Sequence, residues 1–304
     1  EGRYTNEIYV NGFSSSLPED VQYKALRKVV GFEDMKMFRP GYAIEYDFFP
    51  PTQLDISLET KLVKGLFFAG QINGTTGYEE AGCQGLMAGI NAYKFTKNEE
   101  PLVIKRSEGY IGVLIDDLVN KGTNEPYRMF TSRAEYRILL RQDNADLRLT
   151  PIAKSIGMNH MDDRMERVKQ KLDNKKAIEK YFEKYSIDPD VINSRLSELG
   201  SSPIKQKVRL KSILSRPNIS VPTLLEVLPE VKAHLAQYDE ETINLAEVSL
   251  KYEGYIKREQ EMVDKMNRLE QVKLTDTVNY HDLVSLSLEA REKLTEIKPK
   301  TIGQ

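Results

Sequence analysis

The spacing of hydrophobic and polar residues changes along the chain, and up to about residue 106 it is mixed. Short stretches of β-favouring residues lie at 7–10 and 42–49, between turn signals such as Asn-Gly and Pro-Gly. Residues 18–30 have apolar positions that can share one face of a helix. This part of the chain is therefore predicted to contain both α-helix and β-strand.

A short apolar run at 65–69, GLFFA, is bounded by glycines. Such a run is typical of a strand that is buried on both faces. A glycine-rich turn follows it, and after the turn comes a helix of small residues. We therefore predict the order strand, turn and helix over residues 65–89.

From about residue 107 the pattern has the period of α-helix and is rich in Lys, Glu and Leu. The clearest helical stretches are 164–185 and 239–272, and prolines fall between them, where helices end or begin. The expected fold is thus an α/β segment over residues 1–106, followed by a mainly α-helical region over residues 107–304.

The amino-acid composition indicates which class of protein this chain belongs to. With 40% apolar and 30% charged residues, the 304-residue chain resembles a folded globular protein that is long enough for two domains. It has no apolar run of the roughly 18 residues that a membrane span needs and no signal peptide, which predicts a cytoplasmic location. One cysteine and three scattered histidines argue against a disulfide framework and a metal site. A net charge of −2 argues against a protein whose whole surface binds nucleic acid by charge, but it allows a local basic patch.

Glycine is unusually dense after the apolar run, although each glycine in a helix costs ~1 kcal/mol relative to alanine. The residues concerned are Gly70, Gly74, Gly77, Gly82, Gly85 and Gly89. A strand that leads through a glycine turn into a helix can hold a phosphate or a polar ring edge against backbone N–H groups. Close packing of the helix on the strand explains the glycines equally well, so both interpretations stay open.

A second motif is a row of arginines at 125–150. Arg133, Arg137 and Arg141 are spaced four apart, which predicts three guanidinium groups on one helix face. Thr131 or Ser132 is expected to cap this helix, with Glu135 completing a capping box. Arginine forks suit phosphate, and nearby tyrosines suit unpaired bases. A solvated face paired with acidic residues is the alternative.

Three strings resemble the MnmG (GidA) family of tRNA-modifying enzymes. AGQINGTTGYEEA at 69–81 is similar to its second flavin-contacting motif, and PYRMFTSRAEYRILLRQDNADLRLT at 126–150 is nearly the family's own string. KYEGYIKR at 251–258 matches as well. The resemblance covers nearly the whole chain, is weakest between about 155 and 240, and implies the C-terminal part of a longer protein.

The resemblance implies specific site residues. Those expected to bind FAD are Gly70, Gln71, Ile72, Thr75, Thr76 and Gly77. Those expected to bind tRNA are Arg128, Arg133, Arg137, Arg141, Lys257 and Arg258. No catalytic residue is assigned, because the family's catalytic cysteines are expected upstream of residue 1.

Several acidic residues and the cysteine have less certain roles. Glu79 and Glu80 are either partners of a helix dipole or substrate-side groups. Cys83 is interpreted as a small buried residue and not as a reactive thiol. Asp116 and Asp117 either act chemically or pack near a turn.

The resemblance also implies a domain organisation. Residues 1–106 would be the C-terminal part of a glutathione-reductase-type FAD-binding domain, with the end of an inserted subdomain. Residues 107–304 would bind tRNA and the partner protein, and would supply homodimer contacts.

By resemblance, the full-length enzyme modifies C5 of the wobble uridine of tRNA with FAD, NADH and methylene-tetrahydrofolate, together with an MnmE-type GTPase. The first dinucleotide-binding fingerprint is absent from this sequence, so the isolated chain is expected to be inactive and to hold FAD poorly. Three alternatives stay open: a non-catalytic tRNA-binding or assembly module, a flavin oxidoreductase for small molecules, and the related folate-dependent tRNA methyltransferases, which are associated with a shorter C-terminal region.

Overall fold

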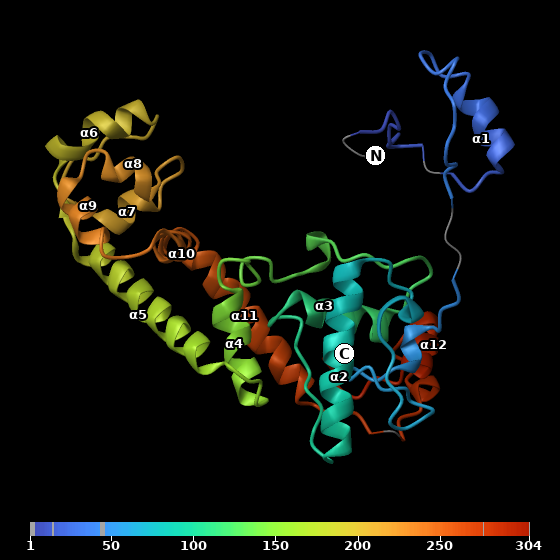
Figure 1. Cartoon of the computed structure of the whole chain (residues 1–304). Helices are drawn as coiled ribbons and strands as arrows, with labels where there is room; N and C mark the ends of the chain where they lie inside the picture. The colour runs from blue at the N-terminus through green and yellow to red at the C-terminus, as the bar shows by residue number, and fades with distance from the viewer. Residues whose placement is uncertain (1–3, 14, 43–45, 276, 304) are drawn as a thin grey trace. The chain divides into compact units, whose positions relative to one another are not determined.

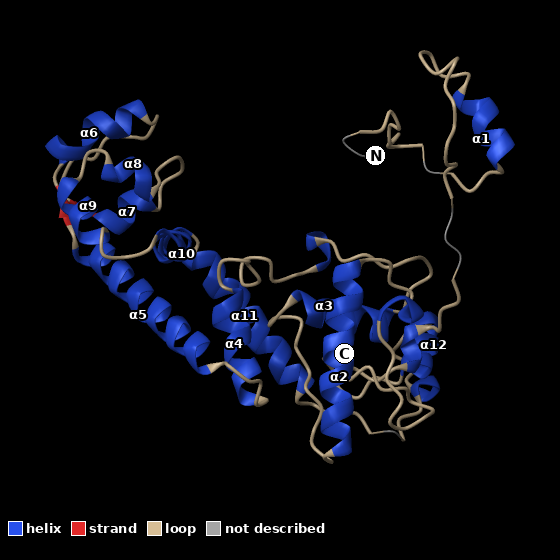
Figure 2. Cartoon of the chain, in the orientation of Figure 1, coloured by secondary structure: helices blue, strands red, loops and turns tan. Residues whose placement is uncertain are grey.

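The computed structural model describes residues 4–13, 15–42, 46–275 and 277–303. The chain forms two compact units, Glu1–Phe48 and Phe49–Gln304. Figures 1 and 2 show that helices dominate the second unit. The predicted domain boundary at 106/107 falls inside this unit and stays a prediction.

The first unit contains one helix, α1 (Glu19–Leu26), within the described part of residues 1–48. It confirms the helix predicted in 18–30, but its apolar face is only partly covered, because Val21 is 40% exposed and Leu26 is half-buried. The buried residue is Gln22, whose side chain bonds both the N–H and the carbonyl of Gly41 at 2.8 and 2.9 Å. Two hydrogen bonds between Gln22 and Gly41 therefore hold α1 in place.

The second unit contains most of the helical elements and both strands of the described chain (Figure 1). In order they are η1 (Pro51–Gln53), η2 (Gly70–Asn73), α2 (Tyr78–Thr96), α3 (Tyr110–Asp116), the π-turn η3 (Asp117–Lys121), η4 (Thr131–Arg133), α4 (Ala145–Ser155), α5 (Asp162–Lys184), β1 (Ser186–Ile187), α6 (Pro189–Glu198), β2 (Val208–Arg209), α7 (Leu210–Leu214), α8 (Val221–Leu225), α9 (Pro229–Leu235), α10 (Glu240–Lys251), α11 (Glu253–Glu270), η5 (Tyr280–Asp282) and α12 (Leu288–Ile297). None of the helices that the structure describes carries an apolar stretch long enough to cross a membrane.

The helix predicted at 164–185 is confirmed as α5. The helical stretch predicted at 239–272 is confirmed, and it consists of two helices, α10 and α11. Tyr252 ends one and precedes the other, with a backbone φ of −103° and ψ of 14° that departs from helical values. The Asp239 side chain caps α10 by accepting the Thr242 N–H at 2.8 Å.

The predicted strands are not formed among the described residues. Residues 7–10 and the described part of 42–49 have no ladder partner, and 43–45 lie outside the described residues. The run at 65–69 pairs through a single antiparallel bridge, Glu59 with Phe67. Leu66 is 42% exposed, so the expected burial on both faces is also wrong. A strand requires a row of hydrogen bonds from a neighbour, and only the short segment around Glu59 supplies any.

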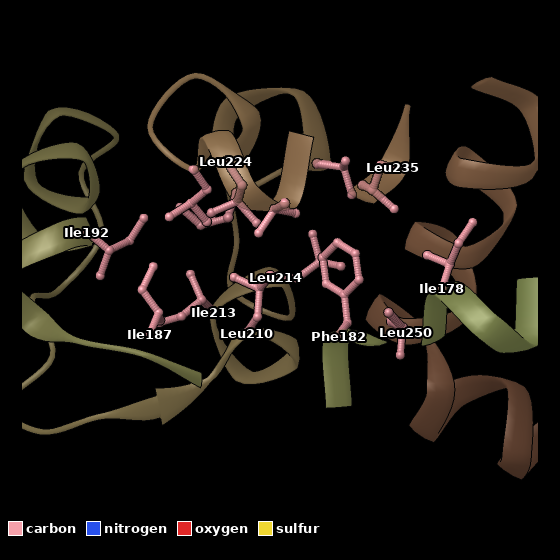
Figure 3. Packing of buried hydrophobic residues seen from close by; sticks show 14 of the residues in the cluster. Ile178, Phe182, Ile187, Ile192, Leu210, Ile213, Leu214, Leu224, Leu235 and Leu250 are labelled. Carbon is pink, nitrogen blue, oxygen red and sulfur yellow. The ribbon is translucent and has the colours of Figure 1, made fainter. Parts of the chain in front are cut away.

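The main hydrophobic core lies in the helical region (Figure 3). The C-terminal half of α5, helices α6 to α9 and α10 bury leucine and isoleucine around Phe182, which is fully buried. β1 and β2 form a two-residue antiparallel ladder, with Ser186 opposite Arg209. A second apolar cluster, around Leu54, Leu114 and Leu118, underlies α2 and α3.

Replacing Phe182 with alanine should reduce the free energy of unfolding by about 3–5 kcal/mol, because a buried ring is lost and a cavity is left. Urea unfolding followed by circular dichroism measures this change. The matched control is Lys180→Ala on the exposed face of α5. Equal losses in the two variants would contradict the assignment of the core.

Candidate functional site

The glycine turn, residues 70–77, links the apolar run to α2. Gly70 has a φ of +84° and Gly74 a φ of +75°, values that side chains disfavour. Between them, η2 folds the backbone into one tight turn. Gly77 then precedes α2, whose N-terminus no side chain caps. The turn therefore places bare backbone directly before a helix start.

Gln84 on α2 holds the glycine turn in place. It is fully buried, and its Oε1 accepts from Gly70 N at 3.1 Å and from Asn73 Nδ2 at 2.8 Å. Its Nε2 donates to Thr75 Oγ1 at 2.9 Å and to the Glu80 carbonyl at 3.0 Å. Gln84 was not predicted from the sequence, where its only signal is an amide side chain among the small residues of a helix.

The residues predicted to bind FAD divide into inward and outward groups. Thr75 is buried, and its hydroxyl also donates to the Gly70 carbonyl at 2.9 Å, so it stabilises the turn. Gln71 and Thr76 are exposed, Ile72 is half-buried, and Gly77 is buried. The structure brings all of them into one turn, and their contact with a cofactor stays a prediction.

Glu80 connects α2 to the segment that follows α3. Its carboxylate is 4% exposed and accepts from Met129 N at 2.8 Å and from Arg128 Nε at 3.3 Å. Burial acts to raise the pKa of Glu80, but these partners outweigh it and the pKa is lowered. Glu79 is exposed. Of the two interpretations of this acidic pair, the geometry favours a structural one for Glu80.

The arginine segment, residues 127–141, is not the predicted helix. It contains an extended stretch, the single 3₁₀ turn η4 and further turns. The predicted capping box is also wrong, because the Glu135 carboxylate accepts from Arg106 Nη2 at 2.6 Å. Burial of Ala134, Tyr136 and Leu140 against α3 and α11 explains the difference, since these contacts fit the irregular backbone.

The predicted tRNA-binding residues are consequently spread along the arginine segment and α11. Arg128, Arg133 and Arg137 are exposed. Arg141 is instead held by Asp143 at 2.9 Å and by the Ile138 carbonyl. Lys257 and Arg258 are exposed on α11. This helix contacts the arginine segment through Glu259, which accepts the Leu139 N–H at 3.2 Å.

Tyr127 joins the glycine turn to the arginine segment. Its N–H donates to the Gly74 carbonyl at 2.8 Å, and its carbonyl accepts from Thr76 N at 3.3 Å. Thr75 and Tyr127 form a parallel bridge by these bonds, and both side chains are buried. Because side chains alternate along extended backbone, Thr76 and Arg128 share the opposite, exposed face.

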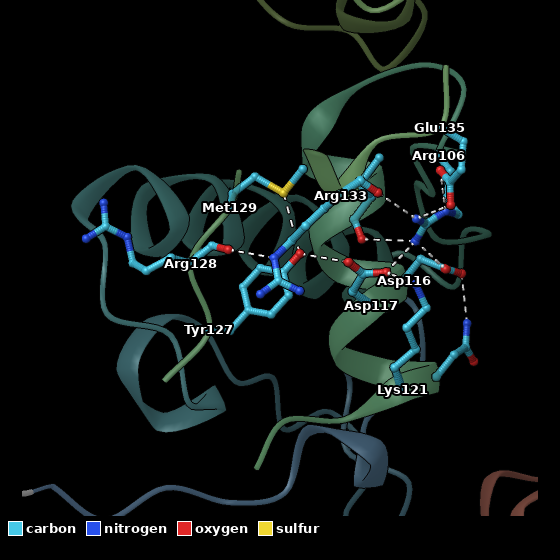
Figure 4. A network of polar contacts seen from close by, with 11 residues as sticks. Arg106, Asp116, Asp117, Lys121, Tyr127, Arg128, Met129, Arg133 and Glu135 are labelled. Atoms are coloured by element: carbon cyan, nitrogen blue, oxygen red, sulfur yellow. Dashed lines mark hydrogen bonds and ion pairs between the residues drawn. The ribbon is translucent and has the colours of Figure 1, made fainter. Parts of the chain in front are cut away.

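An ionic network centred on Arg106 lies beneath the arginine segment (Figure 4). Arg106 pairs with Asp116 at 2.8 Å, with Asp117 at 2.7 Å and with Glu135 at 2.6 Å. Asp117 also accepts from the Tyr127 hydroxyl at 2.9 Å and from Lys121 at 2.7 Å. Asp116 and Asp117 therefore hold the structure together. The sequence analysis missed Arg106, whose partners lie up to 29 residues away.

The Tyr127 ring supports Arg133. The guanidinium carbon of Arg133 lies 4.3 Å from the ring centre, and Arg133 Nε donates to the Arg128 carbonyl at 2.9 Å. Burial and the Asp117 carboxylate raise the pKa of Tyr127 far above its ordinary value, so its hydroxyl remains a donor. Figure 4 shows Arg133 over the ring and the Arg128 side chain directed away from the network.

Cys83 lies half-buried on α2. Burial raises the pKa of its thiol to about 11, so the thiolate is not populated near neutral pH. This agrees with its interpretation as a packing residue. Among the residues that the structure describes, no group of three or more His, Cys, Asp and Glu side chains is placed to hold a metal ion.

Family models match most of the chain in three successive blocks. One described as "Glucose inhibited division protein A" matches residues 1–100. Two described as the MnmG/GidA C-terminal helical domain and helical bundle match residues 162–260 and 262–304. The chain belongs to the MnmG/GidA family. The same order of blocks confirms the predicted fold, a segment of the family's N-terminal domain followed by a mainly helical C-terminal region.

Relatives in this family align along the whole sequence. A tRNA uridine 5-carboxymethylaminomethyl modification enzyme MnmG from Cytophaga hutchinsonii is 60% identical over 100% of this chain and 49% of its own length. One from Flavobacterium psychrophilum is 54% identical, with the same coverage. A crystal structure of Aquifex aeolicus GidA, 39% identical, matches 99% of this chain and 47% of its own, with a TM-score of 0.79. The chain spans about half the length of these relatives.

Replacing Asp117 with asparagine should cost about 2–4 kcal/mol of unfolding free energy at pH 7, because Arg106 loses its most buried partner. Burial acts to raise the pKa of Asp117, but Lys121, Arg106 and Tyr127 lower it overall. Its ionised form therefore stabilises the fold above the unfolded pKa of ~3.9, and this stability is lost as the pH falls through the lower folded pKa.

Denaturant unfolding of both proteins at a series of pH values measures this difference. The gap between wild type and Asp117→Asn should close only below about pH 4. Asp173→Asn, at an exposed position of α5, serves as the control and should show no such gap. A constant gap at every pH would contradict the role of the Asp117 charge.

Proposed function

We propose that this chain forms the flavin-facing and tRNA-binding part of an enzyme that modifies C5 of the wobble uridine of tRNA. The observation that carries the proposal is the pairing of Tyr127 with the glycine turn. This pairing joins the two segments that resemble the family's flavin and tRNA motifs. It also gives Thr76 and Arg128 a common exposed face.

The glycine turn fits a dinucleotide cofactor such as FAD. A Cβ atom at Gly77 would lie 1.5 Å from the Glu80 carboxylate, so bare backbone is required at the start of α2. The uncapped N-terminus of α2 favours an anionic or hydrogen-bond-accepting group. Bound FAD would supply redox chemistry, and the outward-facing Gln71 and Thr76 and the half-buried Ile72 would hold and orient it. Gly70, Thr75 and Gly77 shape the backbone around it.

The exposed arginines suit the phosphates of tRNA. Arg128 and Arg133 are fixed by Glu80 and Tyr127, and Arg137 has no partner among the described residues. A pre-positioned guanidinium loses little freedom when it binds phosphate. Arg141 already pairs with Asp143, so we give it a supporting role. Lys257 and Arg258 on α11 extend the basic surface.

The remaining features of the proposal rest on family membership. The carboxymethylaminomethyl or aminomethyl group would derive from methylene-tetrahydrofolate, with NADH as reductant. The enzyme would act in the cytoplasm as a homodimer with an MnmE-type GTPase. The second candidate is a non-catalytic tRNA-binding or assembly module, which is favoured for the isolated chain because it lacks a dinucleotide-binding fingerprint.

The triple variant Arg128→Gln, Arg133→Gln, Arg137→Gln should bind tRNA more weakly than the wild-type chain. It should also reduce the slope of log K against log salt by about 0.7–0.9 for each lost phosphate contact. Filter binding or fluorescence anisotropy over a salt series measures both quantities. The control changes Arg164, Arg167 and Lys169 to Gln, which removes the same charge from exposed positions on α5. Equal effects in both triple variants would refute the assignment.

In a protein of the relatives' full length that carries this sequence, Gly77→Ala should weaken flavin binding by about five- to 150-fold. The new methyl group displaces Glu80, and overpacking of this kind costs ~1–3 kcal/mol. The flavin-to-protein absorbance ratio measures occupancy. Gly254→Ala, where an added Cβ meets nothing within 4 Å, is the matched control. Unchanged occupancy in Gly77→Ala would argue against FAD at this turn.

A further inference from the structure

Phe130 is an exposed aromatic residue beside the two fixed arginines. Its side chain is 59% exposed, an unusual state for a phenylalanine. The backbone at Phe130 is extended, with a φ of −109° and a ψ of 149°. Along this stretch Tyr127 is buried and Met129 half-buried, whereas Arg128 and Phe130 are exposed. Phe130 therefore shares the outer face with Arg128.

The backbone that carries Phe130 is fixed on both sides. The preceding Met129 N–H donates to the Glu80 carboxylate at 2.8 Å. The Phe130 carbonyl accepts the Arg133 N–H at 3.0 Å, which closes the turn η4. Arg133 Nε in turn bonds the Arg128 carbonyl. The ring is thus exposed on backbone that is already ordered, so a ligand that contacts it would not have to order a loop.

The charges around the ring select the kind of ligand. Arg128 and Arg133 flank Phe130. Arg128 pairs with the buried Glu80 through Nε, and its two terminal nitrogens have no other ion-pair partner among the described residues. Positive charge beside an exposed ring suits an anionic ligand with a flat, apolar face. A nucleotide whose base is unpaired combines both properties, because its phosphate and its base are separate groups.

We infer that Phe130 is a stacking platform for an unpaired base of the bound RNA, with Arg128 on the adjacent phosphate. The inference rests on the proposed function and adds a base-contacting residue to it. Double-stranded RNA does not satisfy the geometry, since its bases stack on one another. A loop nucleotide, or one extruded from a loop, does.

The test uses the 304-residue chain and an anticodon stem-loop RNA with a fluorescent label away from the loop. Phe130→Ala should weaken binding about five- to 150-fold, as expected for loss of one base stack. The salt slope should stay unchanged, because no phosphate contact is lost. Phe130→Leu should weaken binding comparably, because it keeps apolar bulk but lacks a flat ring. Phe38→Ala, at another exposed phenylalanine, is the control.

A tryptophan variant gives a direct signal. The chain contains no tryptophan, so Phe130→Trp would report from this position alone. It should keep wild-type affinity, and its fluorescence should be quenched by the stem-loop but not by a blunt duplex of equal length. Circular dichroism spectra that match wild type establish that each variant is folded.

Three outcomes overturn the inference. In the first, Phe130→Leu binds as tightly as wild type. This result would indicate that residue 130 packs against another apolar protein surface and does not stack on a base. In the second, duplex and stem-loop quench the tryptophan equally. In the third, Phe130→Ala binds normally while the triple arginine variant does not, so the stacking role fails and the proposed function stands. If the arginine variant also binds normally, the proposed function fails as well.

Discussion

Tyr127 takes part in three interactions on which the candidate site depends. Its backbone pairs with Gly74 and Thr76, its hydroxyl donates to Asp117, and its ring lies beneath Arg133. The first two tie the glycine turn and η3 to the arginine segment, and the third lies within that segment. A buried hydroxyl or carboxylate without a partner costs ~1–3 kcal/mol, so the three segments are held together more strongly than one bond would suggest.

The network around Arg106 explains why this arrangement is rigid. A single guanidinium faces three carboxylates: Nη1 donates to Asp116 of α3 and Asp117 of η3, and Nη2 donates to Glu135 of the arginine segment. A lysine would present a point charge and would not fix these directions. Because the Asp117 side chain is only 3% exposed, removing Arg106 would leave its buried charge poorly compensated.

The sequence predicted the parts of the fold that depend on local periodicity. The helix α5 follows from apolar positions repeated over six turns, and it forms nearly where expected. The arginine segment has the same four-residue spacing, but the partners that decide its structure are Arg106 and Glu259, which lie far from it in sequence. Local pattern cannot contain that information. Gln84 and Arg106 were missed for the same reason.

The glycine turn shows what local chemistry can and cannot specify. Its glycines indicated bare backbone correctly, because φ values of +84° and +75° are a local requirement. Which side chains face outward depends instead on the bridge to Tyr127, which turns Thr75 inward and Thr76 outward.

On the proposed assignment, the alternation of inward and outward side chains along the turn separates two roles. Thr75, with Gln84, fixes the backbone of the turn, while Thr76, Arg128 and Phe130 present one outer face. A cofactor held at Thr76 and an RNA phosphate held at Arg128 would then lie on adjacent residues of paired backbone segments. The register of a single parallel bridge, and not the flexibility of a loop, would set how closely the base approaches the cofactor.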